Sequence, residues 1–465
     1  MSAALPARPT LMAELRGSDI ALVREQLGRE PTTRFEVMAR CSGGHPLVVR
    51  NHPFDAEGNP FPTLYWLTCP DAVKVVSTLE SGGWIDRLEE EIDPEALASI
   101  HRAYAEERGR FASEAHGWGG VGGTAAGLKC LHAHYAYHLA GGEDKVGAWV
   151  AARVEPIHEE RQRVAAVDLG TNSIRLLVAE PANGDLQEIA RDMVITRIGK
   201  GVDESGRIDP AALTRTVDVL ARYCRRARAL HAGRIRVGAT SAVRDASNRE
   251  DLEEAVRRHA GSELEVITGE REAELSFLGA TESLDRPGPY LVMDIGGGST
   301  EFVMGDSQPD TAVSTQMGSV RLTERHVAND PPTQEERAAL VSSIDAALED
   351  VERKLDPRQA RTMVSVAGTA TTVRAISLGL DFYDPEPIHG STLSVEEAEA
   401  VLDRLAGMTT PQRAALPVMA PGREDVIVAG ATILVRAVRR FGFQETVVSE
   451  RDILDGLALE MLASS

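Results

Sequence analysis

The sequence has few cysteines and no long uninterrupted apolar run. Four cysteines in 465 residues cannot build the disulfide framework of a small secreted protein, so we expect reduced thiols and a cytoplasmic location. No window is apolar enough to span a bilayer, and the first residues lack the apolar segment of a signal peptide. We therefore expect no membrane partner.

Basic residues are also scarce. The chain has 71 Asp and Glu against 50 Lys and Arg, which gives a formal charge of −21. Broad nucleic-acid binding depends on neutralising phosphates with Lys and Arg, so no nucleic-acid partner is expected. A small anionic ligand remains compatible, because backbone N–H groups and a metal can bind it without a basic surface. We expect a divalent cation to assist at such a site.

The composition changes near Arg163. All four tryptophans and three of the four cysteines precede it. Beyond it, strand and helix patterns alternate along the chain, which is typical of α/β layers. We therefore predict a separate small domain over residues 1–150, a linker over 151–163, and an α/β region after the linker.

One short motif occurs twice in the α/β region. Asp168 in VAAVDLGTNSIRLLV and Asp294 in LVMDIGGGSTEFVMG each follow an apolar strand, and a polar turn and a second strand come next. The two acids are 294 − 168 = 126 residues apart, and a Gly and a Ser of each turn align at the same offset. A strand–turn–strand that opens each half predicts two similar lobes facing each other across a cleft.

The repeated turn has the chemistry of a phosphate site. Successive N–H groups in such a turn converge on an anion, a serine adds a hydroxyl, and glycine permits unusual backbone angles and close approach. An acid at the rim can hold a hydrated Mg²⁺. Two ordinary hairpins are the alternative, but two matching copies favour the phosphate site. The predicted residues are Gly170, Thr171, Asn172, Ser173, Gly296, Gly297, Gly298 and Ser299 for phosphate, and Asp168 and Asp294 for metal.

These motifs resemble the phosphate motifs of the actin-like ATPase superfamily and, more narrowly, those of the exopolyphosphatase/guanosine pentaphosphate phosphatase (Ppx/GppA) family. TRIGKGVDESGRI, GATSAVRDASNRE, ITGEREAELSFLG and VAGTATTVRAISLGL follow in that family's order. The resemblance implies an α/β fold of two actin-like (ribonuclease H-like) lobes around a cleft, preceded by a small α+β domain. Lobe I would comprise 164–268 with the C-terminal helix 449–465 packing back on it, and lobe II would comprise 269–448.

The resemblance also assigns roles to single residues. It puts the catalytic base at Glu272, with Glu270 as the rival, and places Glu301 behind the second turn to support the metal or the water. A solvent-exposed helix face and an outward strand residue are the alternatives. The resemblance also implies phosphate contacts at Arg244, Gly368 and Thr369. The alternatives are an exposed surface arginine at Arg244 and plain helix capping at Gly368 and Thr369.

The resemblance implies a hydrolase that uses Mg²⁺, or alternatively Mn²⁺, to release terminal phosphate from inorganic polyphosphate, guanosine pentaphosphate or both. It also implies a homodimer and the short form of the family, without the additional helical domain of longer members. An actin-like sugar kinase and a non-catalytic nucleotide- or polyphosphate-binding scaffold are the alternatives. The sequence does not choose between the two substrates.

The first domain resembles a small bacterial family of uncharacterised domains, which supplies no activity. Cys130, His134 and His138 fall at i, i+4 and i+8 and could bind zinc with Cys41 or Cys69. A packed core of aromatic rings and thiols is the favoured interpretation. The Gly-rich stretch GWGGVGGTAAG could seat an anion, although it lacks the Gly-Lys-Ser/Thr of a P-loop.

Overall fold

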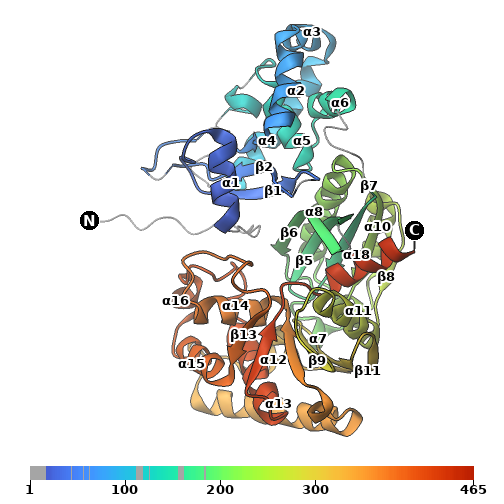
Figure 1. Cartoon of the computed structure of the whole chain (residues 1–465), viewed down its shortest axis with the longest axis vertical. Coiled ribbons are helices and arrows are strands. Elements are labelled where there is room, and N and C mark those ends of the chain that lie inside the picture. Colours follow the sequence, from blue (N-terminus) through green and yellow to red (C-terminus); the bar gives the residue numbers. More distant parts are fainter. Residues whose placement is uncertain are drawn as a thin grey trace.

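The computed structural model describes residues 17–42, 44–55, 57–61, 63–111, 119–124, 126–154, 162–182 and 185–464. Three parts follow one another along the long axis of the molecule (Figure 1). Most of the predicted linker, 155–161, lies outside the described residues. Within these ranges, no helix combines the length and apolarity needed to cross a membrane.

The first domain is α+β, as predicted. Its antiparallel sheet has the order β1-β2-β3, and a cluster of stacked and edge-on rings from Tyr65, Tyr104 and Tyr137 fills the space between sheet and helices. The elements are α1 (Gly17–Leu27), β1 (Phe35–Arg40), β2 (Pro46–Asn51), β3 (Tyr65–Leu67), α2 (Pro70–Ser81), α3 (Trp84–Glu91), α4 (Pro94–Phe111), η2 (Val121–Gly123), α5 (Leu131–Leu139) and α6 (Lys145–Val154).

Lobe I is built on a five-stranded sheet of order β6-β5-β4-β7-β8. Its central strand is a continuous apolar run because helices cover both faces of the sheet. The elements are β4 (Arg163–Leu169), β5 (Ser173–Ala182), β6 (Asp185–Ile195), α7 (Val202–Ser205), α8 (Pro210–Ala229), β7 (Ala232–Ala239), α9 (Ser241–Asp245), α10 (Glu250–Ala260) and β8 (Leu264–Val266). The next helix, α11 (Gly269–Thr281), packs against the sheet of lobe II.

Lobe II is built on a six-stranded sheet of order β11-β10-β9-β12-β14-β13. The elements are β9 (Tyr290–Ile295), β10 (Thr300–Gly305), β11 (Pro309–Thr315), α12 (Ser319–His326), α13 (Gln334–Lys354), η3 (Pro357–Gln359), β12 (Thr362–Val366), α14 (Ala367–Ser377), β13 (Ser391–Ser394), α15 (Val395–Ala406), α16 (Thr410–Ala414), α17 (Ile427–Arg440), β14 (Glu445–Val448) and α18 (Ile453–Ala463).

The two larger sheets repeat one topology. In each, the first three strands form an antiparallel meander, and two later strands continue the sheet in parallel beside the first strand. Lobe II adds β13 as an antiparallel edge. This is the predicted pair of ribonuclease H-like lobes. It places the turns after β4 and β9, which carry the repeated motif, on facing sides of the cleft.

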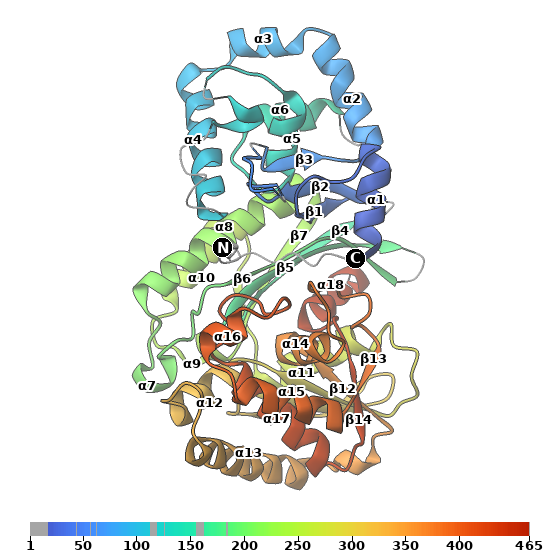
Figure 2. The same ribbon diagram turned by 90° about the vertical axis from the view of Figure 1, so that its left-hand side faces the viewer.

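The last helix returns from lobe II to lobe I (Figure 2). α18 packs against α11 and the strands β4 and β5. Glycine is required at this crossing, because a Cβ on Gly279 would lie 2.0 Å from the carbonyl oxygen of Asp452, and one on Gly456 would lie 2.1 Å from that of Leu275. The chain from β14 to α18 therefore joins both lobes at the bottom of the cleft.

The first domain contacts both lobes. Strand β1 lies beside β6 of lobe I, and the backbone N–H of Gly17 donates to Asp384 of lobe II at 3.0 Å. A buried bidentate pair, Arg40 with Asp19 at 2.7 Å for both contacts, attaches α1 to the sheet. Arg249 is the N-cap residue of α10, since Ser247 and Asn248 bond the α7–α8 connection.

The Asp19–Arg40 pair gives a test of the first domain's stability. We expect Asp19→Ala to lower the free energy of unfolding by about 3–5 kcal/mol, since it leaves a buried guanidinium without its carboxylate. Tryptophan fluorescence in a urea titration reports this domain alone, because all four tryptophans precede residue 150. The exposed pair Arg102–Glu95 is the control, and Glu95→Ala should cost less than about 1 kcal/mol. Equal losses would contradict the account.

Candidate active site

A cavity of about 150 Å³ lies between the lobes, at the ends of β4 and β9. Both turns of the repeated motif line it, together with the start of α11, the start of α14 and the segment before α18. The predicted site residues that line it are Asp168, Gly170, Thr171, Asn172, Ser173, Glu272, Asp294, Gly296, Gly297, Gly298, Ser299, Gly368 and Thr369. Glu301 and Arg244 lie behind this lining.

The two turns have the same hydrogen-bonded form. The N–H of Gly170 donates to the Ser173 carbonyl at 2.9 Å, and the N–H of Gly296 donates to the Ser299 carbonyl at 3.0 Å. The next two N–H groups of each turn find no acceptor anywhere in the described part of the chain. Four donors therefore remain available to an anion in the cleft, as a phosphate site requires.

The predicted reason for the glycines is only partly right. Neither Gly297 nor Gly298 has a positive φ, so neither supplies an unusual backbone angle. Close approach across the cleft requires them instead. A Cβ on Gly298 would lie 2.5 Å from the Ser241 hydroxyl, and one on Gly297 would lie 2.9 Å from the Thr171 Cβ, both in lobe I. The backbone of the second turn therefore packs directly against the side chains of Thr171 and Ser241 in lobe I.

The two copies of the motif differ in the residue that faces the acid across the hairpin. Asp168 pairs in register with Arg175, whereas Asp294 pairs with Glu301. Both partners stand seven residues after their acid, so the repeat places an arginine and a glutamate at equivalent positions. The first acid therefore has a counter-charge beside it, and the second has a like charge.

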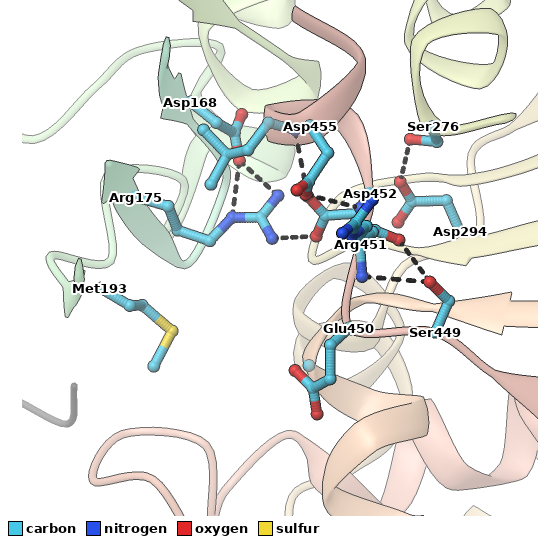
Figure 3. A network of polar contacts seen from close by, with 12 residues as sticks. Asp168, Arg175, Met193, Ser276, Asp294, Ser449, Glu450, Arg451, Asp452 and Asp455 are labelled. Atoms are coloured by element: carbon cyan, nitrogen blue, oxygen red, sulfur yellow. Dashed lines mark hydrogen bonds and ion pairs between the residues drawn. The ribbon is translucent and has the colours of Figure 1, made fainter. Parts of the chain in front are cut away.

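Arg175 is a site residue that the sequence analysis missed. Its guanidinium donates to Asp168 Oδ2 at 2.8 and 3.0 Å and also pairs with Asp452 at the start of α18 (Figure 3). It therefore ties lobe I to the returning C-terminal segment. The other oxygen of Asp168, Oδ1, is buried and has no partner among the described residues. The signal was present, because Arg175 occupies the repeat position of Glu301.

Glu272 lies in the first turn of α11 and lines the cavity, whereas its rival Glu270 is exposed. Burial raises the pKa of Glu272 well above its usual range, and the nearby carboxylates of Glu301 and Asp294 raise it further. Arg244 opposes this shift from 3.4 Å. A carboxyl with a raised pKa in a cleft is suited to exchanging a proton with water.

Asp294 and Glu301 complete a buried acidic cluster. Burial and the nearby Asp452 raise the pKa of Asp294 to about 6, although Ser276 donates to it at 2.5 Å. Burial and Asp294 also raise the pKa of Glu301, which accepts a hydrogen bond from Ser314 at 2.7 Å. Glu301 is therefore close enough to interact with the carboxylates of Asp294 and Glu272, although it does not line the cavity.

The cluster fits a hard divalent cation. Asp168 has a buried carboxylate oxygen with no partner among the described residues. Asp294 lies near other acids, and a cation would relieve the repulsion among them. Oxygen ligands without thiolates or imidazoles favour Mg²⁺ or Mn²⁺ over zinc or copper. The predicted metal-side carboxylates are therefore chemically suited to that role.

The start of α14 forms the other end of the cavity. Ala367 has a positive φ of 66° there, a strained conformation for a residue with a side chain, and Gly368 follows. Arg423 donates to the Gly368 carbonyl at 3.0 Å and to the Thr372 hydroxyl at 2.7 Å. Its buried guanidinium lines the cavity, and sequence spacing gave no sign of it. Other unpredicted lining residues are Arg191, Asp192, Tyr383 and Glu450.

Arg244 does not contact the cavity as predicted. Its guanidinium donates to the Ile267 carbonyl at 2.7 Å and approaches Glu272, so it lies behind the catalytic candidate. Arg321 does not line the cavity either: it donates to the Gly298 carbonyl of the second turn at 2.7 Å and pairs with Asp203 and Asp245 of lobe I. The arginines that line the cavity are Arg175, Arg191 and Arg423.

The predicted zinc set in the first domain is not assembled. Cys130 is the extended N-cap residue of α5, with φ −154°, so helical spacing does not align it with His134 and His138. His134 is buried with Nδ1 bonded to Asp144 at 2.7 Å, and its unpartnered Nε2 belongs to no group of three close ligand atoms among the described residues. Part of the Gly-rich stretch lies outside the described residues. In the described part, the Val121 N–H donates to His101 Nδ1, so this donor is not available to an anion.

Two lobes of this topology, around an acid-rich cleft that carries unpaired backbone N–H donors, place the chain in the actin-like class of folds. The chain belongs to the Ppx/GppA phosphatase family, whose model matches residues 177–465. Residues 37–152 match a family of proteins of unknown function, DUF501.

Relatives of known name or structure cover the same part of the chain. Exopolyphosphatase 2 of Mycobacterium tuberculosis is 45% identical over 314 residues, which is 64% of this chain and 98% of that protein. The crystal structure of an exopolyphosphatase-like protein has a TM-score of 0.62 and 39% identity, covering 65% of this chain and 99% of its own. The crystal structure of a Ppx/GppA family member from Aquifex aeolicus has a TM-score of 0.58 and 32% identity, covering 66% of this chain and 99% of its own.

The contact between the turns gives a second prediction. Gly298→Ala should lower kcat/KM for phosphate release by about 100-fold, because the new Cβ holds the second turn away from Ser241 and misplaces its donors. The melting temperature should change little. Gly233→Ala is the matched control, since its Cβ meets nothing closer than 3.8 Å. Unchanged activity in Gly298→Ala would show that the turns need not meet.

The acidic cluster gives a pH prediction for the metal-free protein. Asp294 has its pKa raised to about 6 in the folded state, so it retains a proton that the unfolded chain releases near pH 4. Its contribution of about 3 kcal/mol is fully present below pH 4 and is lost as pH rises through about 6. Thermal unfolding in a chelator should show this loss in wild type and a smaller one in Asp294→Asn. The exposed Asp310→Asn should behave as wild type; an identical pH dependence in all three would contradict the prediction.

Proposed function

We propose that this protein is a phosphohydrolase that releases the terminal phosphate of inorganic polyphosphate, guanosine pentaphosphate or both. The observation that carries the proposal is Glu272, a buried carboxyl with a raised pKa, between two turns that present free N–H donors. A hydrolase needs both a held phosphate and a base beside the attacking water. The sequence offers no acid positioned against a sugar hydroxyl, which a kinase would require.

Glu272 takes the proton of the attacking water at its carboxylate oxygen. Arg244 approaches Glu272 Oε2 at 3.4 Å and keeps that oxygen oriented, while Glu301 and Asp294 raise its affinity for a proton. The N–H groups of Thr171, Asn172, Gly297 and Gly298 hold the terminal phosphate from both lobes.

Asp168 and Asp294 would hold Mg²⁺, which would supply charge neutralisation for the phosphate oxygens. Arg175 fixes Asp168 Oδ2 and leaves Oδ1 turned to the cleft. Arg423 lies at the opposite end of the cavity, near Gly368 and Thr369, where it can contact the next phosphates of a chain or the nucleotide part of a substrate.

Inorganic polyphosphate is the favoured substrate. The relatives named as exopolyphosphatases include one that is 45% identical along nearly its whole length. A linear polyphosphate requires only phosphate contacts, which the turns and arginines can provide without a base-specific pocket. We also propose a cytoplasmic location, which free thiols at all four cysteines support, and the homodimer that the resemblance implies.

The catalytic role of Glu272 predicts a specific kinetic defect. Glu272→Gln should lower kcat for phosphate release by roughly 100-fold or more, because an amide cannot accept the proton of water, while KM changes little. Glu270→Gln, two residues away on the exposed side of α11, is the matched control and should retain activity. Phosphate release is measured with polyphosphate and with guanosine pentaphosphate, separately and in competition. Full activity in Glu272→Gln would remove the proposal's main support.

A further inference from the structure

A second cluster of metal-ligand side chains lies in the first domain, remote from the cleft. Glu80, Cys130 and His132 each offer one ligand atom, and these atoms all lie within 4.8 Å of one another. No other such group of three occurs within the described ranges. Glu80 stands near the end of α2, while Cys130 and His132 stand at the start of α5, so the cluster joins two helices that pack together (Figure 1).

The separations match those between ligands of one zinc ion. Ligand bonds of about 2.0–2.3 Å at tetrahedral angles place neighbouring ligand atoms about 3.4–3.6 Å apart. Glu80 Oε1 lies 3.1 Å from His132 Nδ1, and Cys130 Sγ lies 3.9 Å from the same nitrogen. The third separation, between Cys130 Sγ and the Glu80 carboxylate, is at most 4.8 Å, so rotation of side chains could bring the three atoms to one ion.

The surroundings of the cluster also prepare it for a cation. His132 Nε2 lies 3.1 Å from the Val73 carbonyl, to which it donates, and the Ser77 hydroxyl is 3.2 Å away. Because Nε2 donates to Val73, Nδ1 is the nitrogen that faces the Glu80 carboxylate, where either a second proton or a metal ion can occupy it. The Leu131 N–H donates to Glu80 Oε1 at 2.6 Å and fixes that carboxylate.

We propose that Cys130, His132 and Glu80 bind Zn²⁺ in the first domain, with water as the fourth ligand. A thiolate, an imidazole and a carboxylate are the borderline set that zinc accepts, and their two negative charges balance the ion. The side chains of His132 and Glu80 are 20% and 24% exposed, so solvent reaches the site. Binding would join α2 to α5.

The test is a metal titration of the full-length chain. Cobalt(II) replaces zinc and reports a thiolate ligand through a charge-transfer absorption in the near ultraviolet, which the oxygen ligands of the cleft cannot produce. Wild type should bind one equivalent with this absorption, and zinc should displace it. Cys130→Ser should lose the absorption, and His132→Gln should weaken zinc binding by more than about 100-fold. Serine is a favourable N-cap, so α5 should remain folded, as circular dichroism would verify.

Two control variants separate this site from other thiols and imidazoles. Cys224→Ala removes a buried thiol of lobe I, and His45→Gln removes an exposed imidazole of the first domain. Both should keep the absorption and the zinc affinity of wild type. Absence of the absorption in wild type, or its survival in Cys130→Ser, would overturn the proposal and leave the His132–Glu80 contact as an ion pair only.

Discussion

The cleft depends on carboxylates buried beside one another with too few positive charges between them. Glu272, Asp294 and Glu301 all have raised pKa values because burial and mutual repulsion disfavour their charged forms. A protein tolerates this arrangement when protons or a cation compensate it. Under the proposed function, the same repulsion that costs stability would prepare the site to take a proton from water and to attract a metal with its polyanionic substrate.

The duplicated fold supplies this cluster by an asymmetry between its two halves. Equivalent hairpins place Asp168 opposite Arg175 and Asp294 opposite Glu301. The arginine neutralises one acid and also holds the segment that leads into α18, whereas the glutamate concentrates negative charge beside Glu272. Duplication thus provides two phosphate-binding turns of the same form, and a single change of residue type gives the two lobes different roles.

Sequence reasoning succeeded where the signal was local. The repeated turns and the two-lobed fold follow from spacing and repetition along the chain. Contacts made by distant residues were missed, such as the pair of Arg175 with Asp452, which are 277 residues apart. The zinc set failed because helical spacing was extended to Cys130, whose backbone is extended. In these cases tertiary packing, rather than the periodicity of the sequence, determined which residues lie close together.

The stereochemical course at phosphorus tests most directly whether water attacks the held phosphate with Glu272 as its base. A substrate with a terminal thiophosphoryl group made chiral with oxygen isotopes would be hydrolysed in water labelled with a third isotope. A single in-line attack by water inverts the configuration at phosphorus, and the account predicts inversion. Retention would mean two successive displacements through a phosphorylated enzyme, and would contradict the assignment of Glu272 as a base acting on water.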